Sequence, residues 1–210
     1  MFALYYDAKQ RKVFALNGSG KSAKDATFER VKRAFPEQFR IPREHGMSVT
    51  VPGCVAGWED ALNEWGSKSL KEVLQPAIRL AREGFPCSEV TAHWWARAGK
   101  EQLEPGKAGK FLPPPLRPGQ LMTNEDLADT LELIANQGKR GFYEGRIAKA
   151  ICEAVGEKGG LLSEDDLRTH SSTFEQPIKM RYRGKHDIYE CPPNGHGLGT
   201  SFELNDGEYM

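Results

Sequence analysis

The sequence has few cysteines and no long apolar run. Its four cysteines, among 210 residues, stand far apart, without a C-x-x-C pair or a nearby histidine at a zinc-ligand spacing. We interpret them as small buried apolar side chains. No stretch approaches the roughly 20 apolar residues of a membrane-spanning helix, and the residues after Met1 lack the basic segment of a secretory signal. The sequence therefore predicts isolated thiols and no membrane span, and it leaves the compartment open.

An excess of charge of either sign is also missing. Lys and Arg total 29, and Asp and Glu total 29, so no overall field attracts nucleic acid, an anionic membrane or an acidic substrate. The choice of partner must depend on a local site. Hydrophobic residues make up 39% of the chain, with ten Phe, six Tyr and four Trp, which argues against disorder. We expect one globular domain, the usual count at this length.

Strand-like segments lie at the two ends of the sequence, and helix-like segments lie between them. Aromatic and β-branched runs predict one hairpin from 2–6 and 12–16 and another from 178–182 and 187–191. The expected fold class is α/β in the α+β sense, with terminal strands that pair with each other or with another part of the protein. Caps and breakers predict helices at about 24–35, 53–66, 69–84, 88–95, 124–137 and 145–155, a capped turn at 163–167, an extended run at 47–51 and a polyproline-like connector at 111–115.

The sharpest local pattern is the glycine-rich loop Asn17-Gly18-Ser19-Gly20-Lys21-Ser22. Its end is similar to a phosphate-binding loop, in which backbone N–H groups surround phosphates and a Lys contacts the outer ones. The stricter pattern needs a glycine where Ala15 stands, and no later apolar run ends in the Asp that would hold magnesium. Three interpretations stay open: a nucleotide site, a plain strand-to-helix turn, and a loop whose backbone approaches a substrate.

Other polar and aromatic residues give weaker signals. The five histidines never fall three or four residues apart, so no helix face presents a metal pair. A Ser/His/Asp triad stays open, because its members are close in space and not in sequence, but no G-x-S-x-G elbow occurs. We expect Trp94 and Trp95 to pack in the core rather than line a cleft. The acidic run Glu164–Asp166 is expected to be a solvated helix start.

Several segments, taken in order, resemble the large subunit of the γ-glutamyltransferases, a family also called glutathione hydrolases. The most specific is the V-P-G-x-V-A-G-[FW] box, which reads V-P-G-C-V-A-G-W at 51–58. The Asn-Gly-Ser-Gly loop at 17–20 also matches in position, after Tyr5-Tyr6-Asp7. Further matching segments lie at 74–78, 81–85, 141–148, 159–167, 182–184 and 191–195, so the resemblance runs from residue 2 to about 200.

The resemblance implies an N-terminal-nucleophile hydrolase with αββα layers, of which this chain would form a part. Proenzymes of the family cut themselves so that a Thr becomes the first residue of a small subunit. That Thr attacks an amide with its own α-amine as base, and water or an amino acid then takes the γ-glutamyl group from the enzyme ester. The implied partners are a small γ-glutamyl or other acyl amide and the small subunit. Neither a metal nor an organic cofactor is implied, and nucleic acid is not expected as a partner.

The extent of the match is the first departure from the family pattern. We expect residues 1–200 to be an incomplete large subunit and residues 201–210 to be an unmatched tail. No threonine stands in a Thr-Thr-His processing context. We therefore assign no catalytic residue in this chain, and we expect the chain alone to be inactive.

The loop is the second departure, and it concerns the substrate. By resemblance, the predicted substrate-binding residues are Asn17, Gly18, Ser19, Gly20 and Lys21. In glutathione-cleaving members this loop holds an Arg that pairs with the substrate α-carboxylate, a task suited to a bidentate guanidinium. Ser19 stands at that position here, with Lys21 nearby as a point charge. The Asn-Gly-Ser-Gly form resembles a γ-glutamyltransferase-like subgroup that we expect to prefer other amides or acylated amines.

Two alternative functions come from other classes of protein. The first is a non-catalytic, truncated relative that acts as a binding module, with unpaired strands that dock on a partner. The second is a small nucleotide-binding protein built on the phosphate-binding-loop-like segment from Gly18 to Ser22. A Thr-Thr-His reading frame downstream in the source gene would favour the proenzyme over the first alternative.

Overall fold

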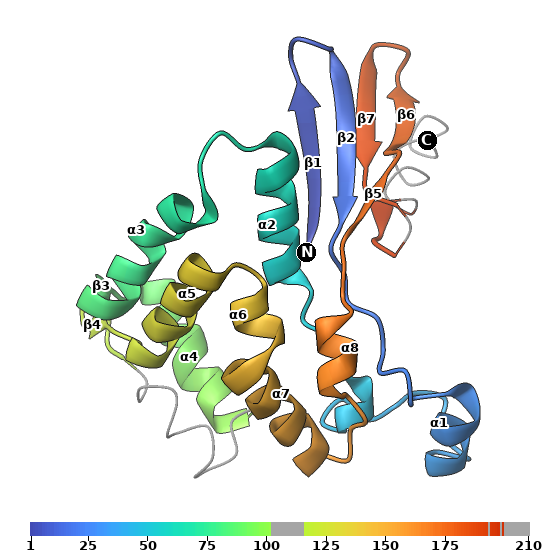
Figure 1. Cartoon of the computed structure of the whole chain (residues 1–210), viewed down its shortest axis with the longest axis vertical. Helices are drawn as coiled ribbons and strands as arrows, with labels where there is room; N and C mark the ends of the chain where they lie inside the picture. The colour runs from blue at the N-terminus through green and yellow to red at the C-terminus, as the bar shows by residue number, and fades with distance from the viewer. Residues whose placement is uncertain (102–115, 193, 198, 200–210) are drawn as a thin grey trace. The chain divides into compact units, whose positions relative to one another are not determined.

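The computed structural model describes residues 1–101, 116–192, 194–197 and 199, without the side chains of 98–101 (Figure 1). The chain divides into two compact units. The first unit combines Met1–Ser67 with the chain from Tyr143 onward, and the second unit is Lys68–Phe142. The connector predicted at 111–115 and the tail at 201–210 lie outside the described residues.

A three-stranded antiparallel sheet carries the candidate loop of the first unit. β1 (Phe2–Asp7) pairs with β2 (Lys12–Asn17) over their whole length, from Phe2 opposite Asn17 to Asp7 opposite Lys12. On its other side β2 pairs with β5 (Thr173–Glu175), which gives the order β1-β2-β5. The first predicted hairpin is confirmed. β2 does pair with a strand from the other end of the sequence, but that strand is β5, which was not predicted, and not one of the two strands expected there, which pair with each other.

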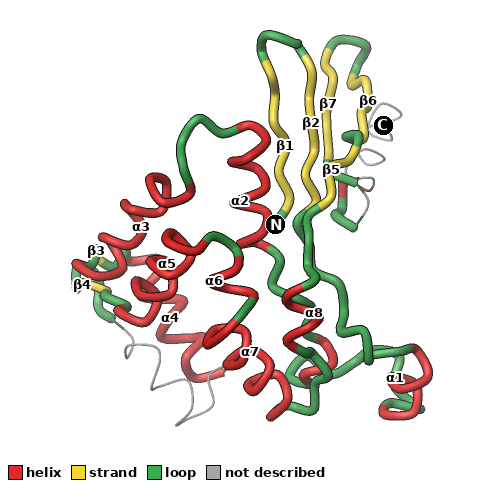
Figure 2. Tube along the Cα trace, in the orientation of Figure 1, coloured by secondary structure: helices red, strands yellow, loops and turns green. Residues whose placement is uncertain are grey.

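The second predicted hairpin is also present, but its second strand lies one residue earlier than the predicted 187–191, so the turn is one residue shorter than expected. β6 (Ile178–Tyr182) pairs antiparallel with β7 (His186–Glu190). Arg183 and Gly184 have φ of 47° and 63°, the left-handed pair that a tight hairpin turn requires. Figure 2 shows the strands of the two hairpins of the first unit as neighbouring yellow segments of the tube.

The helices of the first unit correct two expectations. The helix predicted at 24–35 is the shorter α1 (Phe28–Ala34), because the hydroxyl of Thr27 accepts a hydrogen bond from the Arg30 N–H and begins the helix there. The extended run predicted at 47–51 is wrong in its first half, which belongs to the 3-10 helix η1 (Gly46–Ser48). The other helices of this unit agree with the predictions: α2 (Cys54–Trp65), α7 (Gly145–Glu157) and α8 (Glu164–Arg168).

Helix α2 packs its apolar face on one side of the three-stranded sheet. The Trp65 ring stacks on Tyr5, with centroids 5.1 Å apart, and meets the edge of Phe174 at 5.5 Å. Leu16 on β2 and Val55 on α2 are almost completely buried. Strand alternation places Tyr5 and Leu16 on one face of the sheet, so α2 fixes the position of β2 and of the loop that follows it.

The second unit is mainly helical. The ends of α3 (Leu70–Glu83) agree with the sequence signals, whereas the helix predicted at 88–95 continues to Glu101, and the helix at Arg140–Tyr143 was not predicted. α3 begins at a capping box formed by Ser69 and Glu72 and ends at Gly84, which has φ of 94°. Arg82 bonds Asp129 and Glu132 of α5 at 2.7 and 3.1 Å. The remaining elements are β3 (Phe85–Pro86), α4 (Glu89–Glu101), β4 (Leu121–Met122), α5 (Glu125–Gln137) and α6 (Arg140–Tyr143), whose last residue belongs to the first unit.

The buried side chains of the second unit come mainly from α3 and α5. Leu74, Ile78 and Ala81 of α3 are buried, as are Leu131 and Ile134 of α5. Their spacing of three and four residues is that of an amphipathic helix face. Among the described residues, no helix is both long enough and apolar enough to cross a membrane.

Candidate functional site

The glycine-rich loop begins at the end of β2 and is closed by a ring of side-chain hydrogen bonds. The Asn17 amide donates to the side-chain oxygen of Asn194 at 2.9 Å, and the Asn194 amide donates to the Ser19 hydroxyl at 2.6 Å. Ser19 donates back to the Asn17 side-chain oxygen at 2.8 Å. Each of the three side chains therefore donates and accepts within the ring, and none of them is charged.

Two glycines allow the loop to pack directly on the backbone of the V-P-G box. A Cβ atom at Gly20 would lie 1.6 Å from the carbonyl oxygen of Val51. A Cβ atom at Gly53 would lie 2.3 Å from the carbonyl oxygen of Gly18. The Val51 N–H also donates to the Lys21 carbonyl at 3.0 Å. Only glycine fits at 20 and 53, because no larger residue permits backbone contacts this close.

A buried tyrosine holds the V-P-G box in place from the other side. The Tyr143 hydroxyl donates to the Pro52 carbonyl at 2.8 Å and accepts from the Ala56 N–H at 3.1 Å. Burial raises the pKa of Tyr143 to about 12, against the opposing effect of the hydrogen bond from the Ala56 N–H. The His170 ring lies beside Tyr143, with centroids 5.6 Å apart. The Tyr143 phenol therefore stays neutral near pH 7, and its hydroxyl holds the backbone of the V-P-G box at Pro52 and Ala56.

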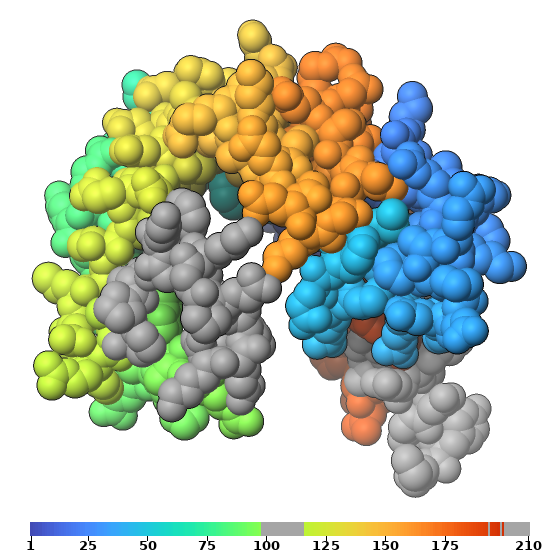
Figure 3. All heavy atoms as spheres, turned by 90° about the horizontal axis from the view of Figure 1, so that it is seen from below, coloured from blue at the N-terminus to red at the C-terminus, as the bar shows by residue number. Residues whose placement is uncertain are grey.

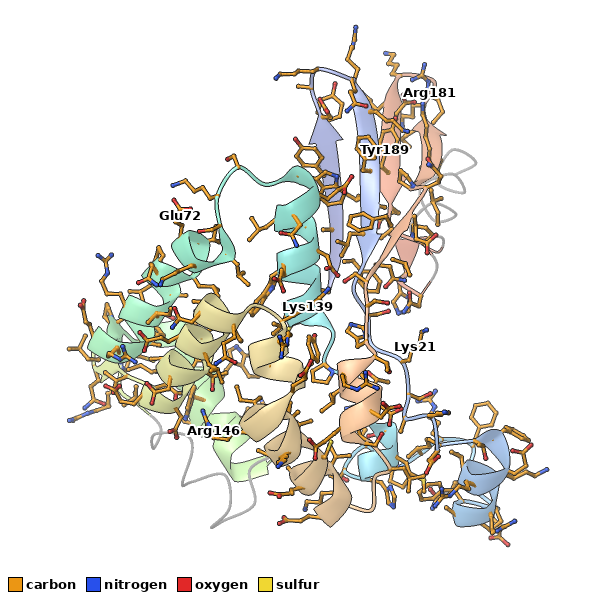
Figure 4. The ribbon with its side chains drawn as sticks, viewed as in Figure 1. Lys21, Glu72, Lys139, Arg146, Arg181 and Tyr189 are labelled. Atoms are coloured by element: carbon orange, nitrogen blue, oxygen red, sulfur yellow. The ribbon has the colours of Figure 1, made fainter. Side chains whose placement is uncertain are left out.

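The predicted loop residues are brought together in space, and the structure adds residues that the sequence did not single out. Asn194 contributes two of the three ring hydrogen bonds, although it is 177 residues from Asn17. Tyr143 and His170 support the V-P-G box. Figure 4 places Lys21 on the segment that follows β2, and its side chain is exposed. The sequence indicated Lys21 as a site residue only through its position in the loop that resembles the family's loop.

The phosphate-binding interpretation does not agree with the local structure. A loop that cradles phosphates leads directly into a helix whose N–H groups face the ligand. Here Ser22 forms a β-bridge with Thr50, and α1 begins only at Phe28. The loop is therefore neither a nucleotide cradle nor a simple strand-to-helix turn.

The weaker candidates mostly have structural roles. His45 caps η1 by accepting from the Met47 N–H at 3.1 Å. Asp166 forms a capping box with Ser163 at the start of α8, as predicted for the acidic run. The core packing expected of the tryptophan pair is wrong for Trp94, which is 56% exposed, with the Arg97 guanidinium 5.6 Å from its ring. In the described part of the chain, no three His, Cys, Asp or Glu residues gather as metal ligands.

Comparison with curated proteins relates this chain to one family. Residues 1–206 match the family described as Gamma-glutamyltranspeptidase. The chain is 31% identical over 203 residues to the glutathione hydrolase proenzyme of Bacillus subtilis strain 168, covering 94% of this chain and 34% of that protein. It is 36% identical over 161 residues to the acylase ACY 1 proenzyme of Pseudomonas sp. strain SE83, covering 75% of this chain and 29% of that protein.

Solved structures agree with the curated relatives. Cephalosporin acylase from Bacillus halodurans has a TM-score of 0.84 and 32% identity, over 94% of this chain and 38% of that one. The gamma-glutamyltranspeptidase of Helicobacter pylori has a TM-score of 0.82 and 29% identity, over 94% of this chain and 57% of that one. The expected mixed α/β fold of the N-terminal-nucleophile hydrolases is confirmed. The chain spans about a third of the length of the curated relatives it matches, and it belongs to the gamma-glutamyltranspeptidase family.

Proposed function

We propose that residues 1–200 form part of the large subunit of an amide-cleaving proenzyme of this family; the family match extends beyond them, to residue 206. The family match supports this, as do the relatives that are named proenzymes. A Thr at the start of a small subunit attacks the amide carbon, and its α-amine takes the hydroxyl proton. The α-amine then gives that proton to the amine of the cleaved amide, which leaves. Water or an amino acid finally takes the acyl group from the Thr ester.

The loop from Asn17 to Lys21 contributes one wall of the acyl pocket in this proposal. The observation that carries the choice of substrate is the neutral ring of Asn17, Ser19 and Asn194. An Arg at position 19 would offer two parallel N–H donors of a charged guanidinium to an α-carboxylate. The Ser19 hydroxyl is uncharged, and it already donates to Asn17 and accepts from Asn194. The protein therefore belongs to the Asn-Gly-Ser-Gly subgroup and prefers acyl groups that lack an α-carboxylate.

The selectivity of the loop is tested with three chromogenic anilides that share one acyl chain length. γ-Glutamyl anilide carries both α-substituents, 4-aminobutyryl anilide lacks only the carboxylate, and butyryl anilide lacks both. The complete wild-type protein should cleave the two anilides without a carboxylate with kcat/KM at least equal to that for γ-glutamyl anilide. Ser19→Arg should raise kcat/KM for γ-glutamyl anilide alone, by roughly 10- to 100-fold, because a charge-assisted hydrogen bond contributes about 1.5–3 kcal/mol.

Ser19→Gln is the matched control, because it breaks the ring without adding charge. If Ser19→Gln and Ser19→Arg have the same effect on all three anilides, the residue at position 19 does not set selectivity for the carboxylate. Cleavage of γ-glutamyl anilide alone by the wild type would contradict the proposed preference while leaving amide cleavage intact.

The non-catalytic alternative has one structural observation in its favour. β1 has no partner on its outer edge among the described residues, and Phe2, Leu4 and Tyr6 on its outward face are 44%, 43% and 57% exposed. Such a strand can pair with another chain. If the complete protein cleaves none of the anilides and lacks a Thr that becomes N-terminal, a binding module becomes the better account.

A further inference from the structure

The turns of the two hairpins of the first unit carry a basic charge that the chain as a whole does not have. Residues 7–12 and 179–187 contain seven Lys and Arg and only two Asp and Glu, whereas the two classes are equal in number over the whole sequence. We call these two stretches, together, the basic end. The excess of positive charge is therefore local, and the rest of the chain has an excess of acid.

Both turns lie at the same end of the first unit. The chain leaves β7 at Cys191, whose thiol lies 3.3 Å from the Ala3 carbonyl of β1 and 4.0 Å from the Leu16 carbonyl of β2. The two hairpins therefore share a base, and Figure 1 shows both turns at the opposite ends of the strands, at the top of the view. Figure 4 places Arg181 at this end. Figure 3 looks at the unit from below, where α1 in blue and α7 in orange form the other end.

The two carboxylates of the basic end do not neutralise it. Asp7 accepts three hydrogen bonds from N–H groups within its own turn, at 2.8 to 3.0 Å. Asp187 is shared by Arg181 at 2.6 Å and Lys179 at 3.1 Å. The other five basic side chains are exposed and form no salt bridge within the described residues: Lys9, Arg11, Lys12, Arg183 and Lys185. A net positive charge therefore stays on the surface of both turns.

Two of these cations occupy a backbone conformation that arginine rarely adopts. Arg11 and Arg183 have φ of 51° and 47°, and they are the non-glycine residues of positive φ in the described part of the chain. The Tyr182 carbonyl accepts from the Lys185 N–H at 3.0 Å, so Arg183 is the first central residue of a tight turn, where Asn, Asp or Gly is usual. Asn or Gly would relieve the strain at both positions but would remove the charge. Strain that is retained together with a charge indicates a function for that charge.

The surroundings of the cations decide between two classes of anionic partner. Single-stranded nucleic acid binds in basic grooves where its bases stack on aromatic rings. Here the rings are engaged by the protein's own cations. The Arg183 guanidinium lies 5.1 Å from the centre of the Tyr182 ring, and the Lys179 ammonium lies 5.6 Å from that of Tyr189. Two turns that project in one direction instead match a flat surface with many negative charges, such as the headgroup layer of an anionic bilayer.

We propose that the basic end binds the surface of an anionic phospholipid bilayer. The attraction is electrostatic and without insertion, because Ala8 is the one apolar side chain in the turn residues 8–11 and 183–185. The same surface repels the acidic excess of the rest of the chain, which favours the orientation with the turns toward the bilayer. Binding of this kind does not depend on the proposed amide cleavage.

The experiment is co-sedimentation of the complete protein with vesicles made of equal parts of phosphatidylcholine and phosphatidylglycerol. Vesicles of phosphatidylcholine alone are the reference without net charge. At about 0.1 M salt we expect binding to the anionic vesicles alone. That binding should be lost at about 1 M salt, because the Debye length falls from about 10 Å to about 3 Å.

The double variant Arg11→Asn with Arg183→Asn tests the two turns. It should weaken binding to the anionic vesicles by about 25-fold, because each basic residue near the surface contributes about fivefold, or about 1 kcal/mol. It should also raise the Tm, because Asn adopts positive φ more readily than Arg. A purely structural role of the arginines would instead lower the Tm and the affinity together.

Two further double variants are the controls. Arg11→Lys with Arg183→Lys keeps both charges and should bind within about twofold of the wild type. Lys68→Gln with Lys71→Gln removes the same charge from exposed positions in the second unit and should leave binding unchanged.

Three outcomes would overturn the proposal. The first is equal binding to both kinds of vesicle, or no binding to the anionic vesicles at about 0.1 M salt. The second is an equal loss of affinity in the lysine control, which would show a response to net charge alone. The third is tighter binding of a single-stranded oligonucleotide at the same salt, measured by fluorescence anisotropy and lost in the Asn variant. If the Asn variant does not fold, Lys9→Gln with Lys185→Gln replaces it, since neither position has a positive φ, and the same loss of affinity is expected.

Discussion

At the scale of single residues, the close approach between the loop and the V-P-G box depends on two glycines, which have no side chain. Gly20 lies against the Val51 carbonyl, and Gly53 against the Gly18 carbonyl. Neither neighbour can move aside easily, because both are backbone atoms. A substitution at either position must therefore displace one segment from the other.

We predict that Gly20→Ala lowers the free energy of unfolding by about 3 kcal/mol or more, at or above the top of the usual range for overpacking, about 1–3 kcal/mol. A Cβ atom 1.6 Å from an oxygen has no room without backbone movement. Urea denaturation followed by circular dichroism measures the change. Gly156→Ala is the control, because a Cβ atom there meets nothing within 4 Å; an equal loss in both variants would contradict the packing argument.

Tyr143→Phe should cost about 1–3 kcal/mol, since it leaves the Pro52 carbonyl and the Ala56 N–H without their hydroxyl partner. The same residue predicts a pH dependence. The folded protein holds the phenol proton more tightly than the unfolded chain does, with a pKa of about 12 against 10.0. This contribution to stability is complete below pH 10 and is lost as the pH rises toward 12.

Denaturation midpoints between pH 8 and pH 12 check the titration. The wild type should lose stability more steeply than Tyr143→Phe above pH 10, because the variant has no proton to release at this position. Parallel curves for the two proteins would show that the hydroxyl does not titrate as the burial implies.

Some of the candidate site could be predicted from single residues and some could not. Asn17, Ser19 and Gly20 lie in one short glycine-rich segment, so the sequence shows them together. Asn194 is the distant partner in the ring, and only the folded sheet brings it to Ser19. Tyr143 has no local signal either, because its role depends on a backbone carbonyl 91 positions earlier.

At the scale of helices and strands, side-chain caps decide where elements begin. The capping boxes at Ser69 and Ser163 have three-residue spacings that can be read directly from the sequence. The missed strands β3, β4 and β5 contain two or three residues each, too few to show alternation. The start of α1 was placed too early because Lys24 to Ala26 have no helix-breaking residue, while the cap at Thr27 depends on local geometry.

Ser69→Ala tests the cap of α3 and should lower the stability of the second unit by about 1 kcal/mol. The Ser69 hydroxyl both accepts from the Glu72 N–H and donates to the Glu72 carboxylate. Hydrogen exchange of amides in α3 measures the loss of protection. Ser67→Ala, two residues earlier and outside the helix, should leave exchange unchanged; equal effects of the two substitutions would argue against the capping role.

At the scale of the whole molecule, the chain forms two compact units. Its basic and acidic residues are equal in number, so its net charge produces no strong electrostatic field. The one-domain expectation from length is replaced by two units, because residues 68–142 form their own helical core within the sequence of the first unit. Nothing in local composition marks these borders. The first unit is closed by pairing between strands 156 or more positions apart, such as Asn17 opposite Thr173.

Self-cleavage is the prediction that belongs to this scale. If the chain is part of a proenzyme, the complete protein should mature into two chains, and the second should begin with Thr. Mass spectrometry and N-terminal sequencing of the purified protein check this. Substituting that Thr with Ala should leave one uncut chain, whereas continued cleavage at the same bond would show that an external protease processes it.

The ring between Asn17, Ser19 and Asn194 also sets an order of events during synthesis. A ribosome releases the first twenty residues long before residue 194, so the β1–β2 hairpin can form while its loop still lacks a partner. Closing a contact across about 175 residues costs entropy that only late packing offsets. The loop from Asn17 to Lys21 is therefore among the last parts of this chain to take shape, and a nascent chain halted before Asn194 would carry the hairpin without the finished loop.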